Sequence, residues 1–282
     1  MKTIVDLPLP SLTMGSFASI SALSDAALFE SHGLRIAFTQ RGGGASLGPY
    51  ASLNLSEAVG DDVLLVQKNK ELLLDAFGAS GLPCVVPRQV HGNTALVLGE
   101  QEENDFEAFL VRAQEGADAI VIEGTKHAAL LCFADCVPII AVSPSGRFAV
   151  IHAGWRGVEK GIAPAALEAL LACDRAAGEA TGYAQFNIYI GPYIHAECFE
   201  ASAEVCEAFG QAFGPDCLVG ENRIDLAKAL RSALVRLGID PARIVDAGIC
   251  SACENESYFS YRAQNGVCGR QGAFAFRLAE KR

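Results

Sequence analysis

Residues 132–157 read CFADCVPIIAVSPSGRFAVIHAGWRG, two apolar runs on either side of a Pro-Ser-Gly turn. Short runs rich in Val and Ile that are bounded by turn residues are typical of buried strands, so this stretch predicts two neighbouring core strands. Each strand also carries one group that an apolar core does not need. Cys136 follows an aspartate on the first strand, and His152 precedes Ala-Gly-Trp-Arg on the second.

The rest of the chain predicts an α+β fold, a single domain with mixed β-sheets flanked by helices. Pairs of strands separate groups of helices, which differs from a simple alternation of strand and helix. No internal repeat or low-complexity linker divides the chain, so we expect one domain over 31–282 and an N-terminal extension with one short helix over 1–30. The expected strands are 34–41, 84–92 paired with 94–99, 117–124, 128–144, 147–155, 184–194, 244–250 and 272–280; the expected helices are 61–79, 159–173, 201–214 and 225–238; the acidic residues 100–116 are expected to form a surface segment.

Composition limits the kinds of partner. The chain has 282 residues, a formal net charge of −11 and a pI of about 4.9. Nucleic acids and anionic membranes are bound by clustered Lys and Arg, so an acidic chain argues against both. No secretory signal is evident, because Asp6, Pro8 and Pro10 interrupt any apolar segment near the N-terminus. We therefore expect a cytoplasmic protein whose ten cysteines are mostly reduced and buried.

Three side chains lie where an expected strand meets a loop, which is a common place for chemistry on a rigid scaffold. They are His91 in PRQVHGN, Cys136 in ADCVP and His152 in IHAGWRG. Two imidazoles and a thiolate suit Zn²⁺, and three protein ligands leave a fourth position for water or substrate. From these residues alone, a metal site, a Cys–His hydrolase pair and ordinary core filling all remain open.

A set of eight motifs in a fixed order resembles one known family. They are TQRGGGASLGPYASLNLSEAVGDD, VPRQVHGN, GADAIV, FADCVPI, IHAGWRG, IGPYIHAECFE, DAGICSACENESYFSYR and GRQGAF. Together they cover about residues 33–280. The set is similar to the bacterial laccase-domain family, first called multicopper polyphenol oxidases. Members are described as zinc-dependent purine nucleoside phosphorylases, and one branch as a peptidoglycan editing factor.

The resemblance implies a zinc ion held by His91, Cys136 and His152, which are the three residues that the strand ends also indicate. It implies phosphorolysis of adenosine, inosine and S-methyl-5'-thioadenosine, with adenosine deaminase activity as a second reaction. It further implies a fold similar to the cytotoxic-necrotizing-factor-like putative cysteine hydrolase fold, which uses a Cys–His pair. A Cys136–His152 hydrolase that edits peptidoglycan precursors is therefore the main alternative.

The oxidase name of the family is tested by the histidine inventory. A multicopper centre needs many histidines, usually in His-x-His pairs, whereas this chain has five histidines and no such pair. One mononuclear zinc site fits this inventory better than copper. A polyphenol oxidase (laccase) and a non-enzymatic metal-binding protein are thus the weaker alternatives.

Several residues are candidates to bind purine nucleosides and phosphate. Arg41 opens a Gly-rich loop whose amides could share an anion with its guanidinium, and it is our leading phosphate ligand. Asn54 is a candidate for the ribose or base, and Arg156 and Arg262 for substrate charge. We expect a monomer or a small homo-oligomer.

The sequence CSAC at 250–253 has C-x-x-C spacing. A redox motif would need a following helix, and a zinc knuckle would need a second pair of ligands. Neither is evident in the sequence, so Cys250 and Cys253 are interpreted as packing residues.

Overall fold

The quoted stretch forms the centre of the protein. In the computed structural model, which describes residues 6–279, β8 (Val137–Val142) pairs antiparallel with β9 (Phe148–Ala153), and every residue of both strands is buried. The Gly146 N–H donates to Ser143 O at 2.9 Å in the connecting turn, where Gly146 has a φ of 79°. A residue with a left-handed backbone conformation in a tight turn is usually glycine, which explains the glycine of the Pro-Ser-Gly turn.

These strands belong to one of two six-stranded mixed sheets. Most neighbours within each sheet are antiparallel, but β4 is parallel to β7, β5 to β6 and β10 to β13. The first sheet has the order β1 (Thr13–Phe17), β2 (Ile20–Ser24), β3 (Leu34–Thr39), β14 (Gln271–Arg277), β7 (Ala128–Phe133) and β4 (Cys84–Val85). The second has the order β13 (Ile244–Asp246), β10 (Asn187–Ile190), β8, β9, β6 (Ala119–Ile122) and β5 (Ala95–Leu98); β11 (Leu218–Val219) and β12 (Arg223–Ile224) form a separate small ribbon.

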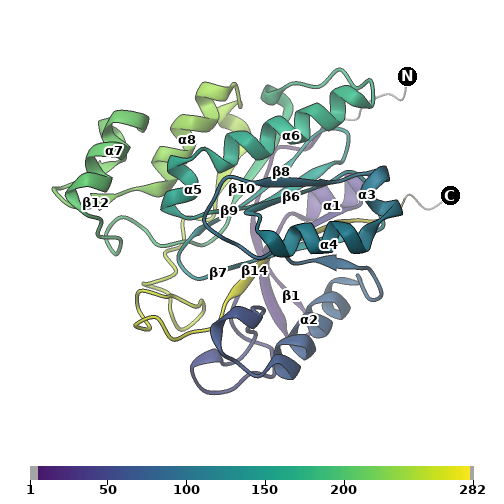
Figure 1. The fold of residues 1–282 in the computed structure, drawn as a ribbon, viewed down its shortest axis with the longest axis horizontal. Coiled ribbons are helices and arrows are strands. Elements are labelled where there is room, and N and C mark those ends of the chain that lie inside the picture. Colours follow the sequence, from purple (N-terminus) through teal and green to yellow (C-terminus); the bar gives the residue numbers. More distant parts are fainter. Residues whose placement is uncertain (1–5, 280–282) are drawn as a thin grey trace.

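The two sheets pack against each other and helices cover their outer faces (Figure 1). Phe38 and Leu131 of the first sheet share a buried cluster with Ile140 and Val150 of the second. The outer face of the second sheet packs against α5 (Trp155–Glu159), α6 (Ile162–Ala176), α7 (Ala203–Phe213) and α8 (Leu226–Leu237), and that of the first against α2 (Val63–Phe77). The remaining helices are α1 (Ala26–His32), α3 (Glu100–Asn104) and α4 (Phe106–Glu115), with 3₁₀ turns at Gly48–Tyr50, Glu57–Val59, Tyr183–Gln185, Pro215–Cys217 and Pro241–Arg243.

The expected α+β class, with mixed sheets in one domain, is confirmed. Expected helix 61–79 is α2, which begins after the N-cap Asp62 and ends at the left-handed Gly78. Expected helix 159–173 corresponds to α5 and α6, which are separated at Gly161.

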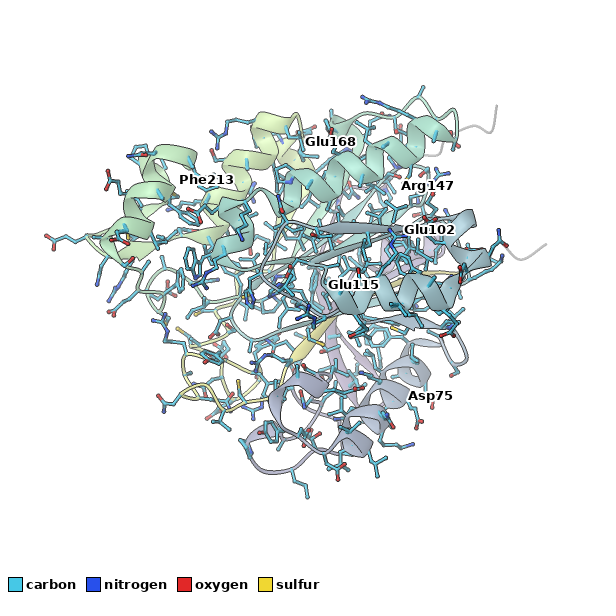
Figure 2. The ribbon with its side chains drawn as sticks, in the orientation of Figure 1. Asp75, Glu102, Glu115, Arg147, Glu168 and Phe213 are labelled. Carbon is cyan, nitrogen blue, oxygen red and sulfur yellow. The ribbon has the colours of Figure 1, made fainter. Side chains whose placement is uncertain are left out.

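Acidic side chains such as Asp75, Glu115 and Glu168 lie on exposed helix positions (Figure 2).

One expectation about local structure is wrong, and a second is incomplete. The segments 84–92 and 94–99 do not pair, because β4 joins β7 in the first sheet while β5 joins β6 in the second. The chain between them crosses from one sheet to the other and presents His91. Residues 100–116 are not merely a surface segment: they form α3 and α4, since Phe109 and Ala113 are buried in the core between the sheets.

The N-terminal region contains more structure than the one short helix expected there. That helix is present as α1, but β1 and β2 precede it and form an antiparallel hairpin. Ala22 and Leu23 of β2 pair with Thr39 and Phe38 of β3, so the hairpin extends the first sheet. Among the described residues 6–279, no helix is both long and apolar enough to cross a membrane.

Candidate metal centre and active-site cavity

His91, Cys136 and His152 converge at one end of the second sheet. Cys136 directly precedes β8 and His152 lies on β9, where it pairs with Pro138, so the hairpin register places them together. His91 arrives from the crossing between β4 and β5. The ligand atoms of the three residues all lie within 4.8 Å of one another, with His91 Nε2 3.8 Å from Cys136 Sγ. The two imidazole rings are 4.9 Å apart and nearly perpendicular.

Gly154 leaves the space that this convergence needs. A Cβ atom at this position would lie 2.8 Å from His91 Cδ2 and 3.0 Å from Cys136 Sγ. Both distances are shorter than normal van der Waals contact, so any larger residue would push apart two of the three side chains. The glycine of IHAGWRG is therefore part of the site's architecture.

Asp118 connects His152 to the backbone at His91 and is the residue that sequence reasoning missed. It is fully buried, and its Oδ1 accepts a hydrogen bond from His152 Nδ1 at 2.8 Å and from the His91 N–H at 3.0 Å. Its Oδ2 accepts the Gly92 N–H at 2.7 Å. Asp118 lies in the motif GADAIV, but a single aspartate before an apolar run does not indicate hydrogen-bond partners elsewhere in the chain. These partners become apparent only in the folded structure.

The charges of the centre are strongly coupled. Burial alone would raise the pKa of Cys136, but the charge of His152 and hydrogen bonds from both histidines lower this pKa to about 6. Burial alone would lower the pKa of His152, but the Cys136 thiolate and the bond to Asp118 raise it to about 9. The Asp118 pKa is lowered, against the effect of burial, by the same His152 bond and by backbone N–H donors. The thiol is thus prepared to ionise near neutral pH.

This donor set fits a zinc ion. The thiolate form of Cys136 is the form that binds metal, and Asp118 occupies Nδ1 of His152, which leaves Nε2 as the ligand atom. A carboxylate that orients a ligating histidine is a common feature of zinc centres. Within residues 6–279, this is the one group of potential ligands that contains two histidines, which disfavours a copper cluster.

A neighbouring buried carboxylate holds the loop before Cys136. Asp135 has a φ of 86°, a left-handed conformation that is unusual for a residue other than glycine. Its Oδ1 accepts the Ser251 hydroxyl at 2.8 Å, and its Oδ2 accepts the Arg262 N–H at 2.7 Å. The segment after β13 is therefore attached to the residue that precedes Cys136.

The three residues open into a cavity of about 1220 Å³. This volume is more than sufficient for a nucleoside. Of the sequence-predicted residues, Arg156 and Arg262 line it, together with Trp155. The guanidinium of Arg156 stacks on the Trp155 ring at 4.2 Å and forms no hydrogen bond with another described residue. Further lining residues that the sequence did not indicate are Lys70, Arg88, Gln89, Gln114, Phe199, Tyr261 and Arg270.

Arg41 and Asn54 are not among the residues that line this cavity. The Arg41 guanidinium donates to Ala51 O at 2.9 Å and Asn255 O at 2.8 Å, and it lies over the Phe259 ring. Asn54 is buried. Its side-chain NH₂ donates to Ser56 O and Asp61 Oδ2, and its Oδ1 accepts the Ser56 and Arg270 N–H groups. Their proposed contacts with substrate remain predictions, whereas the structure shows both holding loops together.

The fold brings a His–Cys–His group that could hold a metal ion to the wall of a large cavity. It belongs to the family described as "Multi-copper polyphenol oxidoreductase laccase", which matches residues 35–277, and the resemblance seen in the motifs is confirmed. A protein named adenosine deaminase RL5, from an unknown prokaryotic organism, is 36% identical over 82% of this chain and 89% of its own. The purine nucleoside phosphorylase YlmD of Geobacillus stearothermophilus is 31% identical over 86% of this chain and 89% of its own.

A solved structure agrees with these sequence relationships. The crystal structure of YlmD from Geobacillus stearothermophilus has a TM-score of 0.80 and 26% sequence identity, and the match covers 96% of this chain and 100% of that one. Only about 4% of this chain therefore lies outside the shared fold.

Proposed function

We propose that this chain is a zinc-dependent purine nucleoside phosphorylase that acts on adenosine, inosine and S-methyl-5'-thioadenosine, with adenosine deaminase activity. The observation that carries the proposal is the convergence of His91, Cys136 and His152 at the wall of a nucleoside-sized cavity. The names of the relatives support the two reactions. A cytoplasmic location and a monomer or small homo-oligomer remain predictions.

The chain's own residues have separable roles. His91, Cys136 and His152 would hold zinc, which supplies a Lewis acid and lowers the pKa of bound water. Asp118 fixes the His152 ring and the backbone at His91. Trp155 lines the cavity and packs against the core, with the Arg156 guanidinium over its ring, so a purine could contact the ring only where these neighbours leave it open.

Phosphorolysis requires an anion site beside the sugar. In this reaction a phosphate oxygen forms a bond to C1' of the ribose, the bond from C1' to the purine nitrogen breaks, and the base takes up a proton. Arg156 and Arg262 reach the cavity, and Arg156 keeps its hydrogen-bond donors available. A guanidinium can bind phosphate through two parallel hydrogen bonds, so we assign the phosphate primarily to Arg156.

Parallel assays test the proposal. The purified protein should carry zinc at the His–Cys–His centre, convert adenosine to adenine and ribose 1-phosphate when phosphate is present, and form inosine in its absence. His91→Ala, Cys136→Ala and His152→Ala should each lose this zinc and both activities. His32→Ala, a histidine outside the cavity lining, is the control. Turnover that persists in all three metal-ligand variants would refute the proposal.

A second function is favoured by one observation, the close approach of Cys136 to His152, whose Nδ1 is held by Asp118. A thiolate, an imidazolium and an orienting carboxylate are also the parts of a cysteine hydrolase. A peptidoglycan-editing hydrolase would need Cys136 and His152 but neither His91 nor zinc. Cleavage of muropeptides by metal-free His91→Ala protein would establish this alternative.

A further inference from the structure

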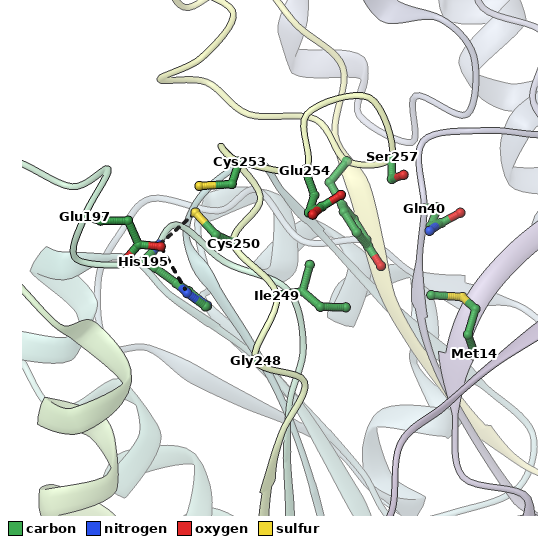
Figure 3. Close-up of a pocket in the computed structure, with 11 residues that line it drawn as sticks. Met14, Gln40, His195, Glu197, Gly248, Ile249, Cys250, Cys253, Glu254 and Ser257 are labelled. Carbon is green, nitrogen blue, oxygen red and sulfur yellow. Dashed lines mark hydrogen bonds and ion pairs between the residues drawn. The ribbon is translucent and has the colours of Figure 1, made fainter.

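A second group of metal-ligating side chains lies outside the centre described above. Cys250 and Cys253 follow β13, and Cys198 lies in the turn that follows β10. The three sulfur atoms all lie within 4.8 Å of one another, and Cys198 Sγ is 3.5 Å from Cys253 Sγ. Figure 3 shows Cys250 and Cys253 pointing to the same side of the loop, beside His195 and Glu197.

The arrangement supplies what the C-x-x-C sequence lacked. A zinc knuckle needs further ligands from elsewhere in the chain, and Cys198 comes from a segment about fifty residues earlier. In a tetrahedral site with Zn–S bonds of about 2.3 Å, the sulfur atoms are ~3.8 Å apart. The Cys198–Cys253 separation of 3.5 Å is close to this value and the other sulfur pairs lie within 4.8 Å, so small side-chain movements would accommodate a zinc ion.

His195 is the nearest candidate for a fourth ligand. One of its ring nitrogens lies within 4.8 Å of Cys250 Sγ and of a Glu197 carboxylate oxygen, but not within 4.8 Å of all three sulfur atoms, so the ring must turn toward Cys198 and Cys253 to complete the site. Its Nδ1 is 3.6 Å from Glu197 Oε1, and its Nε2 is buried without a hydrogen-bond partner. A buried ring nitrogen without a partner is costly unless a ligand satisfies it. The His195 backbone N–H also donates to Cys250 Sγ at 3.4 Å, which ties the His195 backbone to this cysteine.

We propose that Cys198, Cys250 and Cys253 bind a second zinc ion, with His195 as the fourth ligand. The site shares no residue with the His91–Cys136–His152 centre, and four protein ligands leave no open position. Zinc sites of this closed type are structural rather than catalytic. The second ion therefore holds two segments together and takes no part in turnover chemistry.

The segments that it joins also build the catalytic cavity. Tyr193 and Cys250 form an isolated parallel bridge, so both strands of the pair β10 and β13 lead into the second site. Arg262, which lines the cavity, donates from Nη1 to Cys198 O at 3.4 Å and from Nη2 to Glu200 O at 3.3 Å. Fixing Cys198 thus fixes the carbonyl groups that position Arg262.

Metal analysis combined with cysteine modification tests this proposal independently of the catalytic function. The starting point is the His91→Ala/Cys136→Ala double variant, which removes the first centre. It should retain about one zinc per chain, and adding Cys198→Ser or Cys253→Ser should remove that ion. Cys173→Ser, at a cysteine of α6 that belongs to neither group, is the matched control. Unchanged zinc content in the Cys198 and Cys253 variants would overturn the proposal.

A measurement on the unmodified chain covers the case in which a variant does not fold. In zinc-loaded protein, Cys198, Cys250 and Cys253 should all resist alkylation, including the exposed Cys253. After a chelator removes the zinc, all three should become open to alkylation. Peptide mapping identifies the modified cysteines. Equal alkylation of Cys253 with and without chelator would refute the site. A Cys198–Cys253 disulfide, visible as a non-reduced cross-linked peptide in freshly purified protein, would also refute it.

The fourth ligand is tested separately. In the same double variant, His195→Ala should weaken zinc binding by about tenfold or more, while Glu197→Gln should have little effect. A loss caused by Glu197→Gln and not by His195→Ala would overturn the assignment of His195.

Discussion

His152 Nδ1 donates to Asp118 Oδ1 at 2.8 Å, inside a core where Asp118 is fully buried. The same oxygen accepts the His91 N–H, so one carboxylate orients two of the three expected zinc ligands. The Asp118 carboxylate thus links strand β9 to the segment that joins β4 and β5. Much of the geometry of the site therefore depends on a residue that does not itself reach the metal position.

Asp118→Asn should lower zinc affinity without preventing folding. The asparagine preserves the shape of the side chain, but it removes the negative charge and offers one acceptor atom where the carboxylate offers two. Loss of a carboxylate behind a ligating histidine typically costs about 10–100-fold in metal affinity or activity. Competition with a chromogenic chelator measures the affinity, and circular dichroism checks the fold. Wild-type zinc affinity in this variant would show that Asp118 is not a positioning residue.

Gly154→Ala should disrupt the centre by steric contact alone. The added methyl group would lie within 3.0 Å of Cys136 Sγ and closer still to His91 Cδ2, so one of these ligands must move. We expect zinc content and turnover to fall by about tenfold or more. Gly182→Ala is a suitable control, because no atom lies within 4 Å of its added Cβ. If both variants behave alike, the close approach at Gly154 does not limit metal binding.

The sequence predicts the three convergent ligands because each stands beside a conspicuous glycine, proline or tryptophan at a strand end. It does not predict Asp118 or the His195–Cys250 contact, since both depend on pairings between segments distant in the chain. The pairing of 84–92 with 94–99 failed for a related reason. Adjacent strands usually form hairpins, but residues 86–94 leave one sheet and enter the other, and only the packing of the two sheets determines this.

The pH dependence of alkylation should distinguish Cys136 from other thiols in metal-free protein. With a pKa of about 6, Cys136 is protonated below that pH and becomes a reactive thiolate above it. Its alkylation rate should therefore rise through pH 6 and level off near neutrality. Cys132, a buried cysteine outside both groups whose pKa burial raises to about 11, should not react appreciably over this range. His152→Ala should move the Cys136 transition to higher pH, and an unmoved transition would contradict the ion pair.

Phosphate dependence should separate the two arginines proposed as anion ligands. Arg156 is exposed, lines the cavity and donates to no other described residue, so Arg156→Ala should leave folding intact. We expect it to raise the KM for phosphate by about tenfold, which corresponds to ~1.4 kcal/mol. Arg156→Lys should recover only part of this loss, because an ammonium cannot replace a bidentate guanidinium. Deamination, which uses water, should be little changed.

Arg41→Ala is the informative comparison in the same phosphate titration. The sequence predicts Arg41 as the main phosphate ligand, yet its guanidinium donates hydrogen bonds to the carbonyl groups of Ala51 and Asn255. If it acts through these contacts, its loss should lower thermal stability and reduce phosphorolysis and deamination in equal proportion. If it binds phosphate, the KM for phosphate should rise selectively while deamination persists. Initial rates at varied phosphate for the Arg41 and Arg156 variants, with melting temperatures measured in parallel, therefore decide which arginine binds the anion.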